Sequence, residues 1–147
     1  MTNRTHFVMA TCAVLAAASI LHSTVRAQGG KAAADGIYTD AQAKRGQTLY
    51  VDKCAPCHGD DLTGQAGIIP ALTGDSFAMN WQDKSVGDLF DKISMTMPAL
   101  EPGSLKPEQA ADLIAHILSV SKFPAGAAEL APQLEALQQI RIGAPTK

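Results

Sequence analysis

Residues 54–58 are Cys54-Ala55-Pro56-Cys57-His58, a stretch that places two thiols three positions apart and an imidazole directly after the second. Thiols at this spacing can form thioethers with the two vinyl groups on one edge of a porphyrin, and the next side chain then lies beneath the iron. Imidazole suits iron in both oxidation states. The stretch therefore predicts one covalently attached haem c, with Cys54 and Cys57 as attachment points and His58 as an iron ligand.

Other interpretations of the two cysteines are a disulfide, a redox-active dithiol and half of a zinc site. A zinc site needs a second Cys/His pair at ligand spacing, which the sequence lacks. A dithiol of the thioredoxin kind begins a helix within a βαβ unit, and no strand-like alternating run precedes Cys54. Haem attachment therefore remains the favoured interpretation.

The N-terminal residues 1–27 have the pattern of a secretory signal peptide. Arg4 supplies positive charge, residues 7–21 are mostly apolar and uncharged, and Val25-Arg26-Ala27 offers small or apolar residues where a signal peptidase cleaves. We expect cleavage after Ala27 and export, in a bacterium to the periplasm. A retained membrane anchor is the alternative, but the apolar run is shorter than the roughly 20 residues that a span needs. Cys12 lies in this run and would be removed with it.

The charge balance excludes some partners. Without the predicted signal peptide the chain has ten basic and fourteen acidic residues, a formal charge of −4, with no basic cluster. Such a chain is a poor match for nucleic acid or for an anionic membrane surface. About 120 residues are enough for one domain with one core. We expect a flexible leader at 28–37, the domain at 38–122 and a C-terminal extension, partly helical, at 123–147.

Helical periodicity predicts an all-α fold of about four helices around the haem. Helices are expected at 40–53, 85–93 and 107–120. Residues 59–80 are rich in glycine and are expected to form a loop around the haem. The apolar residues of this region that could cover the haem are Ile68, Ile69, Leu72, Phe77 and Trp81. The segment 127–142 has helical spacing of its leucines, which suits either a helix packed on the domain or a docking segment for a partner.

Several motifs together resemble the class I monohaem cytochromes c, which are helical and ligate iron through His and Met. Within that family the chain looks most like periplasmic cytochrome subunits or domains associated with quinoprotein alcohol dehydrogenases. The motifs, in chain order, are Gly46-x-x-x-Tyr50, the 54–58 stretch with Gly59, Pro70-Ala71-Leu72-x-Gly74, Trp81, Met97-Pro98, Pro102-Gly103-Ser104-Leu105 and Phe123-Pro124-Ala125-Gly126.

The resemblance implies specific contacts. The Pro70 carbonyl should accept a hydrogen bond from the second ring nitrogen of His58 and so fix the ring. Gly46 and Tyr50 should lie where the first helix crosses the last, with His116 at the position of a usual aromatic residue. Lys106 stands where a Ser or Thr cap is usual, which should weaken the start of that helix by about 1 kcal/mol.

Methionine is the expected sixth ligand, and Met97 is the best candidate. Pro98 follows it and fixes the local chain direction, so that its thioether can be held toward the iron. Met95 is the second choice, and Met79 and His116 are better explained as structural residues. The expected haem-binding residues are thus Cys54, Cys57, His58, Met97, Pro70, Leu72 and Trp81.

A filled coordination shell predicts a single-electron carrier rather than an enzyme, with no catalytic residues of its own. The expected partners are a periplasmic dehydrogenase as electron donor and an oxidase or another cytochrome as acceptor. The alternative function is an open sixth site, as in a ligand sensor or a peroxidase-like enzyme.

Overall fold

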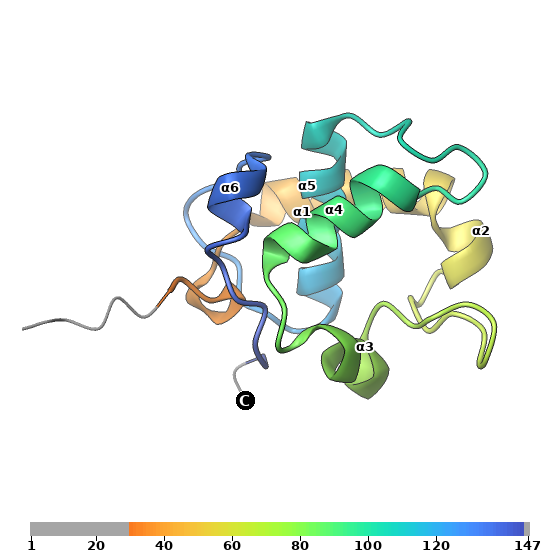
Figure 1. The fold of residues 1–147 in the computed structure, drawn as a ribbon, viewed down its shortest axis with the longest axis horizontal. Helices are drawn as coiled ribbons and strands as arrows, with labels where there is room; N and C mark the ends of the chain where they lie inside the picture. Colours follow the sequence, from red (N-terminus) through yellow and green to blue (C-terminus); the bar gives the residue numbers. More distant parts are fainter. Residues whose placement is uncertain (1–29, 146–147) are drawn as a thin grey trace, which may run out of the picture.

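The computed structural model describes residues 30–145, and the predicted signal peptide lies outside them. Within this range the structure is helical and contains isolated β-bridges but no strand, so the predicted all-α class is confirmed. Three long helices dominate, and shorter ones surround them (Figure 1). No helix in the described part of the chain has the length and apolar character needed to cross a membrane.

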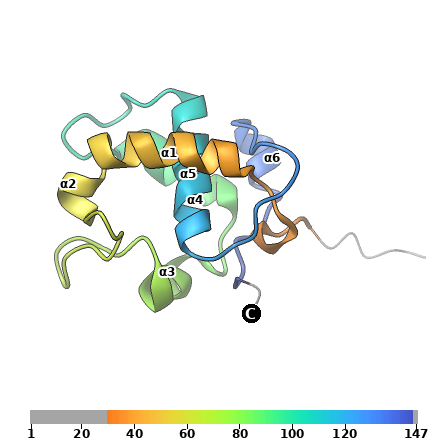
Figure 2. The same cartoon turned by 180° about the vertical axis from the view of Figure 1, so that it is seen from behind.

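Helices α1 (Asp40–Lys53) and α5 (Pro107–Val120) cross at the centre of the molecule (Figure 2). Their backbones touch at Gly46, because a Cβ atom placed on this residue would overlap the carbonyl oxygen of Asp112. Beside this point the rings of Tyr50 and His116 pack at 5.2 Å between centroids. The predicted crossing is therefore confirmed, with His116 as part of the core.

Helix α4 (Val86–Thr96) begins as predicted, at a capping box in which Ser85 and Asp88 bond to each other's backbone N–H groups. The sequence-based prediction ended the helix at residue 93, which is wrong, because the helix continues through Thr96. Pro98 disfavours helical angles at the residue before it, so Met97 leaves the helix while the turn that ends at Thr96 stays intact.

Helix α5 has the predicted bounds, and its start is stabilised without a Ser or Thr cap. The Lys106 side chain does not cap the helix; instead the Gln109 Oε1 accepts a hydrogen bond from the Lys106 N–H at 2.9 Å. Pro107 occupies the first turn, where an absent N–H costs nothing. The two features offset part of the expected weakness.

One short helix lies just before the region that was expected to be a loop, and another occupies its last part. Helix α2 is Ala55–His58, and α3 is Gly74–Trp81, so the predicted loop over 59–80 is wrong for its last third. Phe77 gives α3 its buried face, and its ring stacks on Trp81 at 6.3 Å. The many glycines of this region favoured a loop, and Gly74, which was expected within that loop, is in fact the first residue of α3.

The expected flexible leader is also wrong for the part that the structure describes. Residues 33–35 form a 3-10 helix, η1 (Ala33–Asp35), and Ala33 and Ile37 are fully buried. The Ala33 N–H donates to the Arg141 carbonyl at 2.8 Å, and the Arg141 N–H donates to the Lys31 carbonyl at 2.9 Å. Pairing with the distant C-terminal segment thus orders this stretch, which local composition could not reveal.

The C-terminal segment packs on the domain, as one of the two predicted alternatives had it, but it is not one long helix. Only α6 (Leu134–Leu137) is helical. Leu130, Leu137 and Ile142 are buried in the same core as α1, α4 and α5. Pro132 and the backbone pairing of residues 140–143 with residues 31–33 and 82–86 keep the rest extended.

Candidate haem site

The anchor, residues 54–58, forms a tight turn at the end of α1. The Cys54 N–H donates to the Tyr50 carbonyl at 2.8 Å, which completes α1, and the His58 N–H donates to the Cys54 carbonyl at 2.9 Å, which closes α2. Cys54 is half-buried, Cys57 is exposed, and both thiols are free. Burial and the neighbouring Cys57 raise the pKa of the unattached Cys54 thiol to about 11, so before haem attachment the sulfur keeps its proton at neutral pH.

The His58 side chain is buried, with 8% of its surface exposed, and its ring is fixed by one contact. The Nδ1 atom lies 3.0 Å from the Pro70 carbonyl oxygen, the contact that the resemblance implied. Since a carbonyl can only accept, Nδ1 carries a proton, and in the neutral ring the lone pair is therefore on Nε2. This is the tautomer in which histidine binds a metal through Nε2, with a basicity raised by the carbonyl.

Gly64 leaves the space in which the Pro70 carbonyl lies, a role that sequence reasoning missed. Its N–H donates to the His58 carbonyl at 2.8 Å, and a Cβ atom here would overlap the Ile69 carbonyl oxygen and lie 2.8 Å from that of Pro70. Its φ of +65° also favours glycine. The sequence signalled only a glycine in a loop, because the close approach depends on how residues 59–70 fold back.

Tyr50 ties the anchor to the α1–α5 crossing. Its hydroxyl donates to the carbonyl of Gly59, directly after His58, at 2.8 Å, and its ring packs on His116. Burial raises the pKa of Tyr50 above its ordinary value, with nearby Cys54, Asp61 and Asp60 adding to the shift. The hydroxyl therefore remains a donor over the working pH range.

The structure separates the candidates for the sixth ligand by their surroundings. Met97 directly follows α4, has extended backbone angles and is half-buried. Met95 and Met79 are 69% and 74% exposed, and His116 is enclosed between α1 and α5. The segment after α4 lies at the same end of the molecule as α2 (Figure 1). Met97 is the most covered methionine among the described residues.

Leu72 and Trp81, the remaining predicted haem contacts, are half-buried. The Leu72 N–H donates to the Leu62 carbonyl at 2.8 Å, which closes the 62–72 loop. Trp81 packs between Phe77 and Lys84, whose ammonium nitrogen lies 4.6 Å from the ring centroid. The haem contacts of both residues stay predictions.

The residues present fit a c-type haem. Two free thiols and an imidazole with one nitrogen committed supply the attachment and one axial ligand. The Ser94 hydroxyl, three positions before Met97, is buried and has no partner among residues 30–145, so a polar group could still bind there. No cluster of three metal-binding side chains occurs in the described range, as a zinc interpretation would require.

Comparison with known proteins agrees with this chemistry. Residues 41–117, just over half of the chain, match the family described as cytochrome C oxidase, cbb3-type, subunit III. The matched stretch runs from α1 through the anchor and Met97 into α5. The chain belongs to this cytochrome c family and is a monohaem cytochrome c.

Relatives and a solved structure are similar at lower identity. Cytochromes c from Cannabis sativa and Guizotia abyssinica are 27% and 28% identical over 96 residues, which is 51% of this chain and 86% of each of them. The crystal structure of the sulfane dehydrogenase SoxCD from Paracoccus pantotrophus contains a chain of similar fold, at TM-score 0.50 and 22% identity. That match covers 73% of this chain and 54% of that one.

Proposed function

We propose that this cytochrome c is a single-electron carrier whose iron is bound between His58 and Met97. The contact between His58 Nδ1 and the Pro70 carbonyl, at 3.0 Å, carries the proposal, because it leaves Nε2 as the metal-binding atom of the anchor. Membership of the cytochrome c family supports electron transfer as the activity. The partial burial of Met97 supports it as the second ligand.

Each of the proposed haem-binding residues would have its own role in electron transfer. Bound haem supplies a one-electron couple between Fe(III) and Fe(II). Cys54 and Cys57 hold the group covalently, and Pro70 keeps the His58 ring in one orientation. A Met97 thioether favours Fe(II) more than a second imidazole would, which raises the potential. If His58 and Met97 both bind the iron, no site is left for a substrate, and electrons would be exchanged with a partner on the side where Cys57 is exposed.

The proposed setting is the periplasm, with a dehydrogenase as electron donor and an oxidase or a second cytochrome as acceptor. The pattern of residues 1–27 supports export. The motif resemblance to cytochromes associated with quinoprotein alcohol dehydrogenases supports the donor class. The fold likeness to a chain of a sulfane dehydrogenase structure is consistent with a donor of this kind. Mass analysis of the exported protein should find Gln28 as the first residue.

Carbon monoxide tests the ligand assignment. The reduced wild-type protein should not bind carbon monoxide, because Met97 occupies the sixth position. Met97→Ala should bind it readily and have a lower reduction potential, whereas Met95→Ala, the matched control two positions away, should behave as wild type. Ready binding by the wild-type protein would instead indicate an open site, as in a sensor or a peroxidase-like enzyme.

A further inference from the structure

The C-terminal tail, residues 123–143, contacts both helices that lead to the proposed iron ligands. We propose that its second half, residues 134–143, braces α4 and thereby positions Met97 for ligation; the inference rests on the proposed function of Met97. The whole tail lies beyond the family match, which ends at residue 117, so its contact with α4 is a feature of this chain rather than of the matched region.

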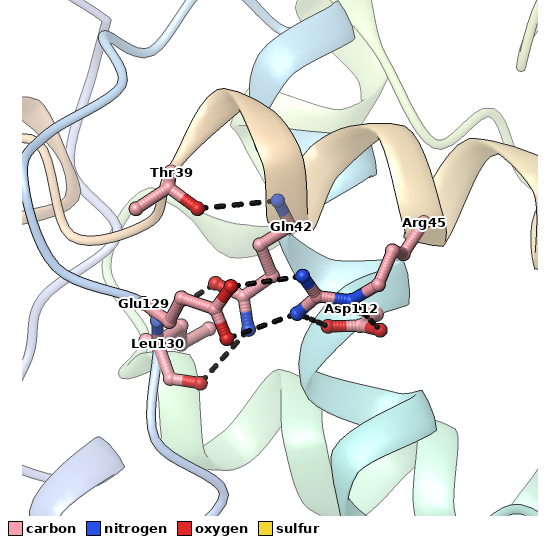
Figure 3. A network of polar contacts seen from close by, with 6 residues as sticks. All are labelled: Thr39, Gln42, Arg45, Asp112, Glu129 and Leu130. Atoms are coloured by element: carbon pink, nitrogen blue, oxygen red, sulfur yellow. Dashed lines mark hydrogen bonds and ion pairs between the residues drawn. The ribbon is translucent and has the colours of Figure 1, made fainter.

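The first half of the tail, residues 123–130, is fastened to α1 and to the residues before it. The Gln42 side chain, buried in α1, bonds to both backbone groups of Leu130, donating to the carbonyl at 3.0 Å and accepting from the N–H at 2.7 Å. The Arg45 guanidinium bridges Asp112 of α5 and Glu129 of the tail (Figure 3). These contacts lie at the opposite end of α1 from the anchor.

The second half is fastened to the start of α4 and to the turn before it. The bonds, all from N–H to carbonyl, are Val86 to Ile140 at 2.8 Å, Ile142 to Lys84 at 3.0 Å and Gly143 to Gln82 at 3.0 Å. Gly87 allows the two backbones to touch, because a Cβ atom there would lie 2.8 Å from the Gln138 nitrogen. Leu137 and Ile142 are buried beneath this contact.

Met97 depends on α4 for its position. Its N–H donates to the Ile93 carbonyl at 3.0 Å, which continues the helical ladder by one bond. In the segment that follows, the observed backbone bonds are internal, from Glu101 to Pro98 and from Ser104 to Glu101. Within residues 30–145, therefore, no backbone bond outside α4 holds Met97 in place.

The tail contacts the first turn of α4, and Met97 follows its last turn, so the direction of the helix axis determines where Met97 lies. Eleven helical residues span roughly 16 Å, so a small tilt at Val86 moves the far end by more than it moves the near end. The inner face of α4, through Leu89, Phe90 and Ile93, rests on the core. The tail contact at the first turn fixes the direction in which the helix points from that support.

Two alanine variants at similarly buried positions distinguish an effect on the position of Met97 from a general loss of stability. Ile142→Ala removes a buried side chain from the half that holds α4, and Leu130→Ala removes one from the half that holds α1. In Ile142→Ala, carbon monoxide binding to the reduced protein should accelerate about tenfold and the methionine-to-iron charge-transfer band of the oxidised protein should weaken. Leu130→Ala should change both by less than twofold, although both variants lower the denaturant midpoint.

A measurement that does not depend on the iron accompanies this pair. Amide hydrogen exchange at Met97 should accelerate about tenfold in Ile142→Ala and remain within twofold of wild type in Leu130→Ala. Where Ile142→Ala fails to fold, the smaller change Ile142→Val should shift the same readouts in the same direction by a lesser factor. If the two alanine variants change these readouts equally, in proportion to their lost stability, the proposal that residues 134–143 position Met97 is wrong.

The two proposals fail in different ways. If the wild-type protein itself lacks the methionine band and binds carbon monoxide readily, the Met97 assignment is wrong. If the wild-type protein has the band and Ile142→Ala keeps it with unchanged ligand binding and exchange, Met97 is the ligand and the tail does not position it.

Discussion

The α1–α5 crossing and the segments that carry the proposed iron ligands are built in different ways. At the crossing, Gly46 and Asp112 touch backbone to backbone, and the rings of Tyr50 and His116 fill the space beside them. The 59–73 loop and the segment after Met97 are instead shaped by turns and single hydrogen bonds. Close packing resists any change of volume, whereas a loop held by single bonds depends on each of them. Substitutions at the crossing should therefore have the largest effect on stability. Substitutions in the loops should have the largest effect on the properties of the iron site.

Gly46→Ala should cause the largest loss of stability. The added methyl group would overlap the Asp112 carbonyl, which is backbone and cannot turn aside. Separating α1 from α5 should cost about 3 kcal/mol or more, well above the gain of about 1 kcal/mol that alanine brings to a helix interior. Denaturant unfolding measures the change. A loss below 1 kcal/mol would show that the crossing is not close-packed.

Gly64→Ala should have a smaller effect on stability and a larger one on the iron site. The positive φ and the contact with the Ile69 and Pro70 carbonyls should cost about 1–3 kcal/mol. Displacement of the Pro70 carbonyl would free the His58 ring and change the basicity of the ligand. Potentiometry should find a shifted reduction potential. Gly67→Ala, a loop glycine with positive φ and nothing near its Cβ position, is the matched control and should leave the potential unchanged.

Tyr50→Phe tests the link between the two regions. The ring and its packing on His116 are kept, and only the hydroxyl that bonds to the Gly59 carbonyl is lost. We expect a loss of about 1 kcal/mol in unfolding free energy, as for one hydrogen bond with a half-buried partner. Amide exchange should accelerate in residues 59–64 and stay unchanged in α5. Equal acceleration in both would contradict a local role.

The smallest effect should come from His116, and it should depend on pH. Burial, with the nearby charge of Lys44, lowers the pKa of His116 below its ordinary value of 6.5, so the unfolded chain binds this proton before the folded one does. Stability should therefore fall as the pH drops below about 6.5. His116→Phe should remove this part of the acid sensitivity while keeping an aromatic ring at the crossing. Unfolding curves at pH 7.5 and pH 5 measure the difference, and an unchanged slope with pH would refute the assignment.

Local patterns in the sequence were sufficient where one segment determines its own structure. The helical patterns predicted that the three long helices start at residues 40, 85 and 107, within one residue of the observed starts. The anchor predicted its own chemistry, because thioether spacing and the following histidine are adjacent in the chain. The same local view failed at α3 and at residues 94–96, where glycine and proline were given more influence than their positions allow.

The sequence by itself determined the helical class, the Cys54–His58 anchor and the short set of possible sixth ligands, since these depend on residues that are neighbours in the chain. The motif resemblance implied the Pro70 contact, but only the tertiary structure decided which other residues support the anchor and how the loop brings them there. Gly64 and Pro70 meet His58 after the loop folds back, and Arg141 lies between residues 31–33 and residue 85, far from both in sequence. Contacts between distant segments depend on how the whole core packs, and no local pattern encodes that packing.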